Sequence, residues 1–83
     1  MKASSKIEVF SQNNCSGCVQ VKNLLQSKNI PFIEYNLSTQ PMSKQLLLNR
    51  VPGVRTVPQV FINNILIGGL KELQEELKKV DYS

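Results

Sequence analysis

The chain has 83 residues, the size of one small domain, so we expect residues 1–83 to fold as a single unit. Ten basic residues against six acidic ones give a net charge of +4, but the sequence has neither a basic run nor an aromatic RNA-binding motif, so nucleic acid is not an expected partner. The lack of histidine excludes Cys–His proteolytic chemistry and zinc sites that use histidine.

Residues 6–11 are predicted to form the first strand, with Ile7, Val9 and Phe10 as core candidates. Phe10 breaks the strict alternation of apolar and polar residues, which is expected of a strand covered on both faces. A polar turn follows. Its last residue, Asn14, is a candidate cap for the next helix because its side chain can accept a hydrogen bond from an unpaired backbone N–H.

Cys15 and Cys18 are the only cysteines of the chain, and their C-x-x-C spacing falls at the start of a helix predicted over 15–28. One helical turn separates the two sulfurs, which is close enough for a disulfide. The unpaired N–H groups and the positive dipole end of the helix favour a thiolate on the first cysteine. Because a thiolate is the species that attacks disulfides, we predict that Cys15 is the nucleophile and Cys18 the resolving thiol.

A transient, catalytic cysteine pair is typical of a reducing compartment, whereas secreted domains use larger disulfide frameworks. No apolar stretch approaches the roughly 18 residues of a membrane span. Met1–Ser5 leads into the first strand without the apolar region of a secretory signal, so we expect a cytoplasmic protein with no membrane partner. Two alternatives for the cysteine pair are a pair of structural thiols and a zinc site completed by another chain.

The middle of the chain predicts a parallel crossover. Helix 15–28 has an apolar face and a natural stop at Asn29. The strand expected at residues 32–37 then runs parallel to the first one, because a strand, a helix and a second strand of this length form a right-handed crossover. A second helix begins near Pro41 and ends at Pro52-Gly53; its apolar residues are Met42, Leu46, Leu47 and Val51.

The last third predicts a hairpin and a helix. Two short apolar runs, at 59–62 and 65–67, are separated by Asn63-Asn64, and asparagine tolerates the positive φ of a tight hairpin turn. Gly68-Gly69 closes the hairpin. The final helix is expected to present one apolar stripe, made of Leu70, Leu73, Leu77 and Val80. The element order β-α-β-α-β-β-α predicts a small layered α/β domain.

Three motifs together resemble the glutaredoxin family: the C-x-x-C pair after the first strand, Thr56-Val57-Pro58 before the hairpin, and Gly68-Gly69 before the last helix. The resemblance extends from Lys6 to about Lys79. It implies a thioredoxin-like fold, with a four-stranded mixed sheet that carries helices on both faces. It also implies a cis peptide bond before Pro58 and the use of glutathione.

The resemblance further implies a binding site for glutathione, which is similar to a short peptide with two carboxylates. The backbone around Thr56 and Val57 would face the cysteines and pair with a bound peptide like an added strand. The start of the last helix would hold the γ-glutamyl carboxylate through residues Gly69, Leu70 and Lys71. Either Arg50 or Arg55 would reach the glycyl carboxylate.

This chain departs from the family pattern at three places. Family members usually carry a lysine two or three residues before the first cysteine, where this chain has Gln12 and Asn13. The usual Pro-Tyr between the cysteines is here Ser16-Gly17, which removes an aromatic wall. A small polar or acidic residue is common in the family where Lys71 stands.

The resemblance implies an enzyme: a glutathione-dependent thiol–disulfide oxidoreductase, acting as a monomer in electron transport and cell redox homeostasis. Its substrates would be protein disulfides and glutathione mixed disulfides, with ribonucleotide reductase as one candidate client. No metal is expected, apart from one alternative in which a dimer holds a two-iron two-sulfur cluster through Cys15 of each chain and two glutathiones. A second alternative is a glutaredoxin-like protein that thioredoxin reductase reduces directly.

Overall fold

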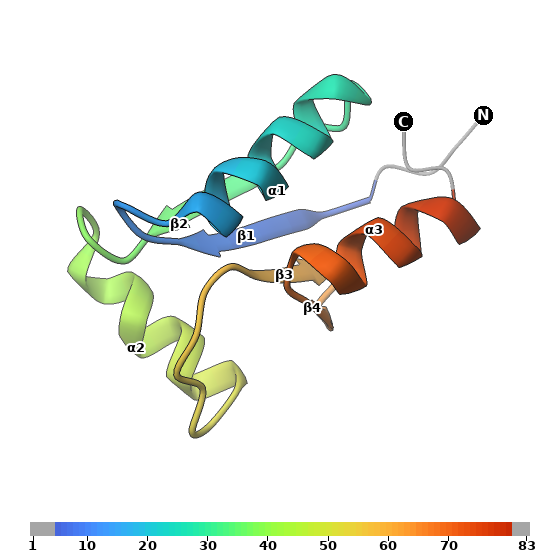
Figure 1. Ribbon diagram of the computed structural model, residues 1–83. Helices are drawn as coiled ribbons and strands as arrows, with labels where there is room; N and C mark the ends of the chain where they lie inside the picture. Colours follow the sequence, from blue (N-terminus) through green and yellow to red (C-terminus); the bar gives the residue numbers. More distant parts are fainter. Residues whose placement is uncertain (1–4, 81–83) are drawn as a thin grey trace.

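The computed structural model describes residues 5–80, which form one four-stranded sheet and three helices (Figure 1). In chain order the elements are β1 (Ile7–Ser11), α1 (Ser16–Ser27), β2 (Ile33–Asn36), α2 (Pro41–Arg50), β3 (Gln59–Ile62), β4 (Ile65–Gly68) and α3 (Leu70–Lys79). The strands lie in the order β2-β1-β3-β4; β1 is parallel to β2 and antiparallel to β3, and β3 is antiparallel to β4. This arrangement confirms the predicted element order and the mixed sheet. Within residues 5–80 no helix has the length and apolar character to cross a membrane.

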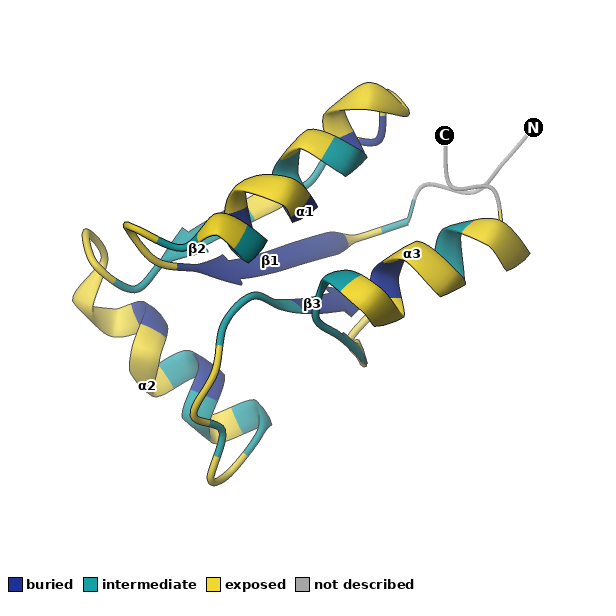
Figure 2. Ribbon diagram, in the orientation of Figure 1, coloured by how far each residue is buried: buried dark blue, intermediate teal, exposed yellow. Residues whose placement is uncertain are grey.

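Strand β1 is the centre of the domain, and all five of its residues are buried (Figure 2). One face of the sheet packs against α1 and α3, with a buried cluster of Ile7, Val9, Val21, Leu25, Ile30, Val60, Ile62 and Leu73. The opposite face packs against α2, with a smaller buried cluster of Phe10, Leu47 and Phe61. The predicted covering of the first strand on both faces is therefore confirmed.

The start of α1 differs from the prediction. Asn14 adopts a left-handed conformation with φ of 57° and does not cap the helix. The N-cap is Cys15 instead, whose sulfur accepts a hydrogen bond from the backbone N–H of Cys18. The helix begins one residue later than expected, and its N-cap is Cys15 rather than Asn14.

Other local predictions are confirmed by the backbone. Asn29 has φ of 57° just after α1, and the hairpin turn places Asn63 and Asn64 at φ of 52° and 69°. Gly53 has φ of 82°, as expected at the turn after α2. Met42 was expected on the apolar face of α2, but its side chain is 78% exposed, because the buried residues of that helix are Ser43 and Leu47.

A buried ion pair joins β1 to the end of α2. The side chain of Glu8 is completely buried, and its carboxylate accepts two hydrogen bonds from the Arg50 guanidinium, at 2.7 and 3.1 Å. It also accepts one from the Tyr35 hydroxyl at 3.1 Å. The guanidinium lies 5.6 Å from the ring centre of Phe10 and 5.1 Å from that of Phe61. The sequence analysis did not single out Glu8, because a charged residue within an apolar strand gives no local indication of its partner.

Hydrogen bonds from cationic side chains lower the pKa of two carboxylates, those of Glu8 and Glu34. The Arg50 guanidinium holds the pKa of Glu8 below its ordinary value, against the opposing effect of burial. Lys22, together with the Ser11 hydroxyl, holds the pKa of Glu34 below its ordinary value. In both cases the folded state binds the proton less tightly than the unfolded chain does.

We predict that Arg50→Met lowers the free energy of unfolding by about 3–5 kcal/mol, because it leaves the buried Glu8 carboxylate without its main partner. The free energy of unfolding should fall much less in the double variant Glu8→Leu/Arg50→Met, since no unpaired charge remains. Urea unfolding at neutral pH measures both. A loss below about 1 kcal/mol for the single variant, the size typical of a solvent-exposed pair, would contradict this account.

The lowered pKa values also predict how stability depends on pH. The stabilisation from Glu8 and Glu34 is complete above the ordinary carboxyl value of 4.5, and it is lost as the pH falls through the lower folded-state values. Urea unfolding at a series of pH values should therefore show a free energy of unfolding that declines below that point. The decline should be shallower in Glu8→Leu/Arg50→Met; identical pH profiles for the two proteins would refute the role given to Glu8.

Candidate functional site

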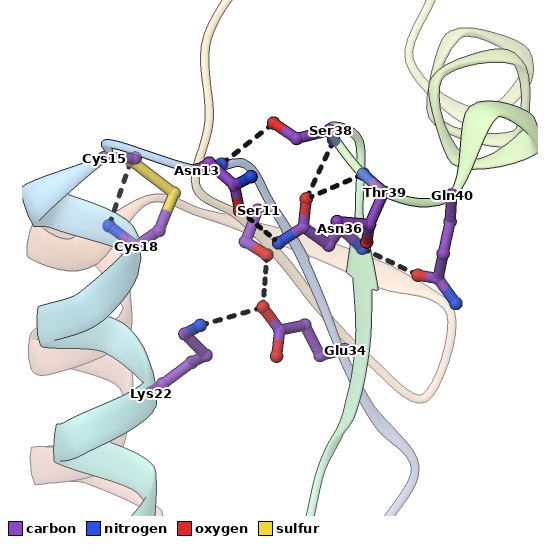
Figure 3. A network of polar contacts seen from close by, with 10 residues as sticks. All are labelled: Ser11, Asn13, Cys15, Cys18, Lys22, Glu34, Asn36, Ser38, Thr39 and Gln40. Atoms are coloured by element: carbon purple, nitrogen blue, oxygen red, sulfur yellow. Dashed lines mark hydrogen bonds and ion pairs between the residues drawn. A yellow bond between two sulfur atoms is a disulfide. The ribbon is translucent and has the colours of Figure 1, made fainter.

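Cys15 and Cys18 lie at the N-terminus of α1 and are joined by a disulfide, with their Cα atoms 5.3 Å apart (Figure 3). Cys15 is partly exposed, whereas Cys18 is 1% exposed. A partner in solution can therefore reach the first sulfur but not the second. This difference agrees with the predicted roles of Cys15 as nucleophile and Cys18 as resolving thiol.

The helix terminus is built to stabilise negative charge on the Cys15 sulfur. The backbone N–H of Cys18 donates to that sulfur at 3.1 Å, and the N–H of Val19 donates to the Cys15 carbonyl at 3.2 Å. Once the disulfide is reduced, the same sulfur can carry the charge of a thiolate beside an N–H donor and the positive end of the helix dipole. The predicted nucleophile thus sits where the helix favours its reactive form.

The segment before β3 lies against the exposed sulfur. The Val57–Pro58 peptide bond is cis, as the family resemblance implied. The carbonyl oxygen of Val57 is 3.8 Å from the Cys15 sulfur. A disulfide attacked by Cys15 would therefore approach alongside the Val57 backbone.

Two glycines allow both helix N-termini to approach Pro58. A Cβ added to Gly17 in α1 would lie 3.3 Å from Cδ of Pro58, and a Cβ added to Gly69 would lie 3.4 Å from the Pro58 carbonyl oxygen. The first distance is shorter than most Cβ contacts, whereas the second is at the short end of ordinary van der Waals contact. The predicted residues Leu70 and Lys71 form the first turn of α3 and so follow directly after this contact.

Glu72 completes the start of α3. Its carboxylate accepts a hydrogen bond from the Gly69 N–H at 2.9 Å, which satisfies one of the unpaired donors of the helix terminus. Gly68, just before it, has φ of 122°, and a Cβ there would lie 2.9 Å from Cγ of Glu72. The Gly68-Gly69 pair therefore serves both the hairpin exit and the close approach to Pro58.

A pocket of about 470 Å³ opens beside Val57, between α2 and the segment that precedes β3. Its lining includes the predicted residues Arg55, Thr56 and Val57, together with Gln12, one of the two residues that stand where family members usually carry a lysine. Lys44 of α2 also lines the pocket and was missed by the sequence analysis. Lys44 was missed because it lies far along the chain from the other site residues. The only available signal was helical spacing, which places it one turn before the pocket residues Leu47 and Leu48.

Arg50 does not belong to this site. The sequence analysis offered Arg50 or Arg55 for the glycyl carboxylate, but the Arg50 guanidinium is occupied by the buried carboxylate of Glu8. Arg55 is exposed, lines the pocket, and has no ion pair with the other described residues. Of the two arginines, Arg55 is thus the available cation.

The site contains no metal-binding cluster within one chain. Across residues 5–80, no group of three or more histidine, cysteine, aspartate or glutamate side chains could hold a metal ion. The cysteine pair at the start of α1, joined as a disulfide in this structure, is the redox-capable group that the arrangement presents.

Comparisons with known proteins agree on one family. A family model described as Glutaredoxin matches residues 7–67. A probable glutaredoxin of Synechocystis is 38% identical over 69 residues, which cover 83% of this chain and 63% of that relative. A second probable glutaredoxin of the same organism is 32% identical over 73 residues, covering 88% of this chain and 83% of the relative.

Solved structures give the same result. The crystal structure of a buckwheat glutaredoxin–glutathione complex superposes with a TM-score of 0.77 at 29% identity, covering 94% of this chain and 73% of that one. The structure of glutaredoxin 1 from Francisella tularensis, complexed with cacodylate, superposes with a TM-score of 0.76 at 30% identity. It covers 92% of this chain and 95% of the Francisella chain. These neighbours confirm the thioredoxin-like fold.

Proposed function

The chain belongs to the glutaredoxin family of thiol–disulfide oxidoreductases, and from this membership we propose that it uses glutathione to reduce protein disulfides and glutathione mixed disulfides. The observation that carries the proposal is the position of the partly exposed Cys15 sulfur, 3.8 Å from the Val57 carbonyl and bonded to the N–H of Cys18. The similarity to a glutaredoxin solved with glutathione supports the choice of reductant. The chain spans 63% of the first Synechocystis relative named above. The activity and the clients are therefore proposed for this domain itself.

The reaction on a glutathione mixed disulfide needs Cys15 alone. The Cys15 thiolate attacks the glutathione sulfur, the client leaves as a thiolate that takes up a proton, and Cys15 becomes linked to glutathione. A second glutathione, as its thiolate, then attacks the glutathione sulfur of that mixed disulfide. Oxidised glutathione is released and the Cys15 thiolate is restored.

A client disulfide needs both cysteines. The Cys15 thiolate attacks one client sulfur and forms a mixed disulfide with the client. The Cys18 thiol loses its proton and attacks the Cys15 sulfur, which releases the reduced client and leaves the Cys15–Cys18 disulfide seen in this structure. Two glutathiones then reduce that disulfide and leave together as oxidised glutathione.

Bound glutathione would lie across the backbone of Val57, with its cysteinyl sulfur at Cys15. Its glycyl carboxylate would meet the pocket that contains Lys44 and Arg55, the two cations on that side. Its γ-glutamyl carboxylate would meet the start of α3 at Leu70 and Lys71, where a helix N-terminus favours an anion. A dicarboxylate peptide would thus meet Lys44 and Arg55 at one end, and the α3 N-terminus with Lys71 at the other.

We predict glutathione-coupled activity that distinguishes the two cysteines. NADPH consumption is measured with hydroxyethyl disulfide in two couplings, one with glutathione and glutathione reductase and one with thioredoxin reductase alone. The parent protein should be active in the first coupling only. Cys18→Ser should keep the reduction of glutathione mixed disulfides and lose the reduction of a protein disulfide, whereas Cys15→Ser should lose both.

Two results would count against this proposal. Activity with thioredoxin reductase alone would show that the reductant is not glutathione. Gln12 and Lys71, where the chain departs from the family, would then be the first residues to substitute. Retention of protein-disulfide reduction by Cys18→Ser would remove Cys18 from the resolving step.

A further inference from the structure

Two loops on the same edge of the sheet are tied together by side chains beside Cys15 (Figure 3). The loop after β1 carries Asn13 and leads into Cys15, and the loop after β2 carries Ser38 and leads into α2. The backbone N–H of Asn13 donates to the Ser38 hydroxyl at 3.0 Å. The side-chain amide of Asn36 donates to the Asn13 side-chain oxygen at 3.1 Å. We name these three residues, Asn13, Asn36 and Ser38, the loop clamp.

Asn36 is the centre of the loop clamp because both the oxygen and the nitrogen of its side-chain amide form hydrogen bonds. Its side-chain oxygen accepts hydrogen bonds from the backbone N–H groups of Ser38 and Thr39, at 2.8 and 3.3 Å, which shapes the loop after β2. Its side-chain nitrogen reaches across to Asn13. Its own backbone N–H donates to the Gln40 side chain at 2.8 Å. One residue therefore shapes its own loop and holds the neighbouring one.

The sheet does not need these cross-loop bonds. Strands β1 and β2 are already paired as far as Ser11 and Asn36, and the Leu37 N–H continues that pairing to the Ser11 carbonyl at 2.7 Å. Asn13 and Ser38 lie at exposed positions outside the buried clusters. The cross-loop bonds thus order the loops rather than the core.

The loop clamp acts on the segment that presents the nucleophile. Asn13 is followed by Asn14 in a left-handed conformation and then by Cys15, the N-cap of α1. Gln12 and Ser38, one from each loop, both line the pocket beside Val57. Fixing Asn13 therefore fixes the approach to Cys15 on one side and a wall of the pocket on the other.

We propose that Asn36 is a positioning residue for Cys15, acting through Asn13 and Ser38 to keep the sulfur at the α1 terminus and the pocket wall in place. The catalytic part of this proposal rests on the proposed function. Without the loop clamp, the Cys15 loop would sample conformations in which the sulfur no longer meets the Cys18 N–H. A smaller share of Cys15 would then be in the stabilised thiolate form.

The test compares variants that each remove one cross-loop bond or none. Asn13→Ala removes the acceptor for Asn36, and Ser38→Ala removes the acceptor for the Asn13 N–H. Thr39→Ala is the matched control, because it removes a neighbouring exposed hydroxyl while its backbone N–H still bonds to Asn36. Asn36→Asp keeps the turn acceptor and loses the donor to Asn13.

The first readout is the rate at which iodoacetamide alkylates Cys15 in the reduced protein at pH 7, followed by mass spectrometry. Asn13→Ala, Ser38→Ala and Asn36→Asp should each slow it by at least about threefold, because the thiolate is the form that reacts. Thr39→Ala should match the parent. The thermal midpoints should stay close together, since the removed bonds are exposed.

The second readout is steady-state reduction of a glutathionylated cysteine peptide. The loop-clamp variants should lower kcat/KM by about three- to tenfold, because a smaller share of Cys15 thiolate slows the attack and the pocket wall moves. Alkylation rates equal to that of Thr39→Ala would overturn the proposal, whatever the steady-state values are. A parent inactive with glutathione would refute the proposed function instead, and the alkylation readout would still decide the role of the loop clamp.

Discussion

The site depends on the close approach of two helix N-termini to one stretch of backbone, Val57-Pro58. Gly17 in α1 leaves room for this approach, since a Cβ there would lie 3.3 Å from Cδ of Pro58, and a Cβ at Gly69 before α3 would lie 3.4 Å from the Pro58 carbonyl oxygen. The N-termini carry unpaired N–H groups and positive dipole ends. Because they meet at one place, the positive ends of both helix dipoles lie close to the same stretch of backbone. The chemistry of Cys15 follows from this packing.

The α2 face of the sheet carries the pocket beside Val57. Arg50 ends α2 and is fixed to β1 by the buried carboxylate of Glu8, so the chain that leads from α2 to Val57 starts from an anchored point. The same ion pair explains why Arg50 does not line the pocket, although it lies near the pocket residues in sequence. Lys44 and Arg55 remain as the cations of the pocket.

Features set by neighbouring residues were predictable from the sequence, whereas those set by distant partners were not. The hairpin at Asn63-Asn64 and the cysteine pair were predicted because a few adjacent residues determine them. Local pattern was insufficient for the pairing of Glu8 with Arg50, which are 42 positions apart. The contact between Asn13 and Asn36 joins residues 23 positions apart, and it could not be predicted from local pattern either. Such contacts exist only once the sheet order brings the strand ends together.

The most direct test of this account is a crystal structure of the Cys18→Ser protein in disulfide linkage with glutathione. We expect glutathione on Cys15, with its cysteinyl backbone hydrogen-bonded to Val57 and its glycyl carboxylate beside Lys44 and Arg55. Glutathione that is attached to Cys15 but lies away from Val57 would contradict the central claim, which is that the groove beside Val57-Pro58 binds the peptide. Failure to form the adduct at all would contradict the assignment of Cys15 as the nucleophile.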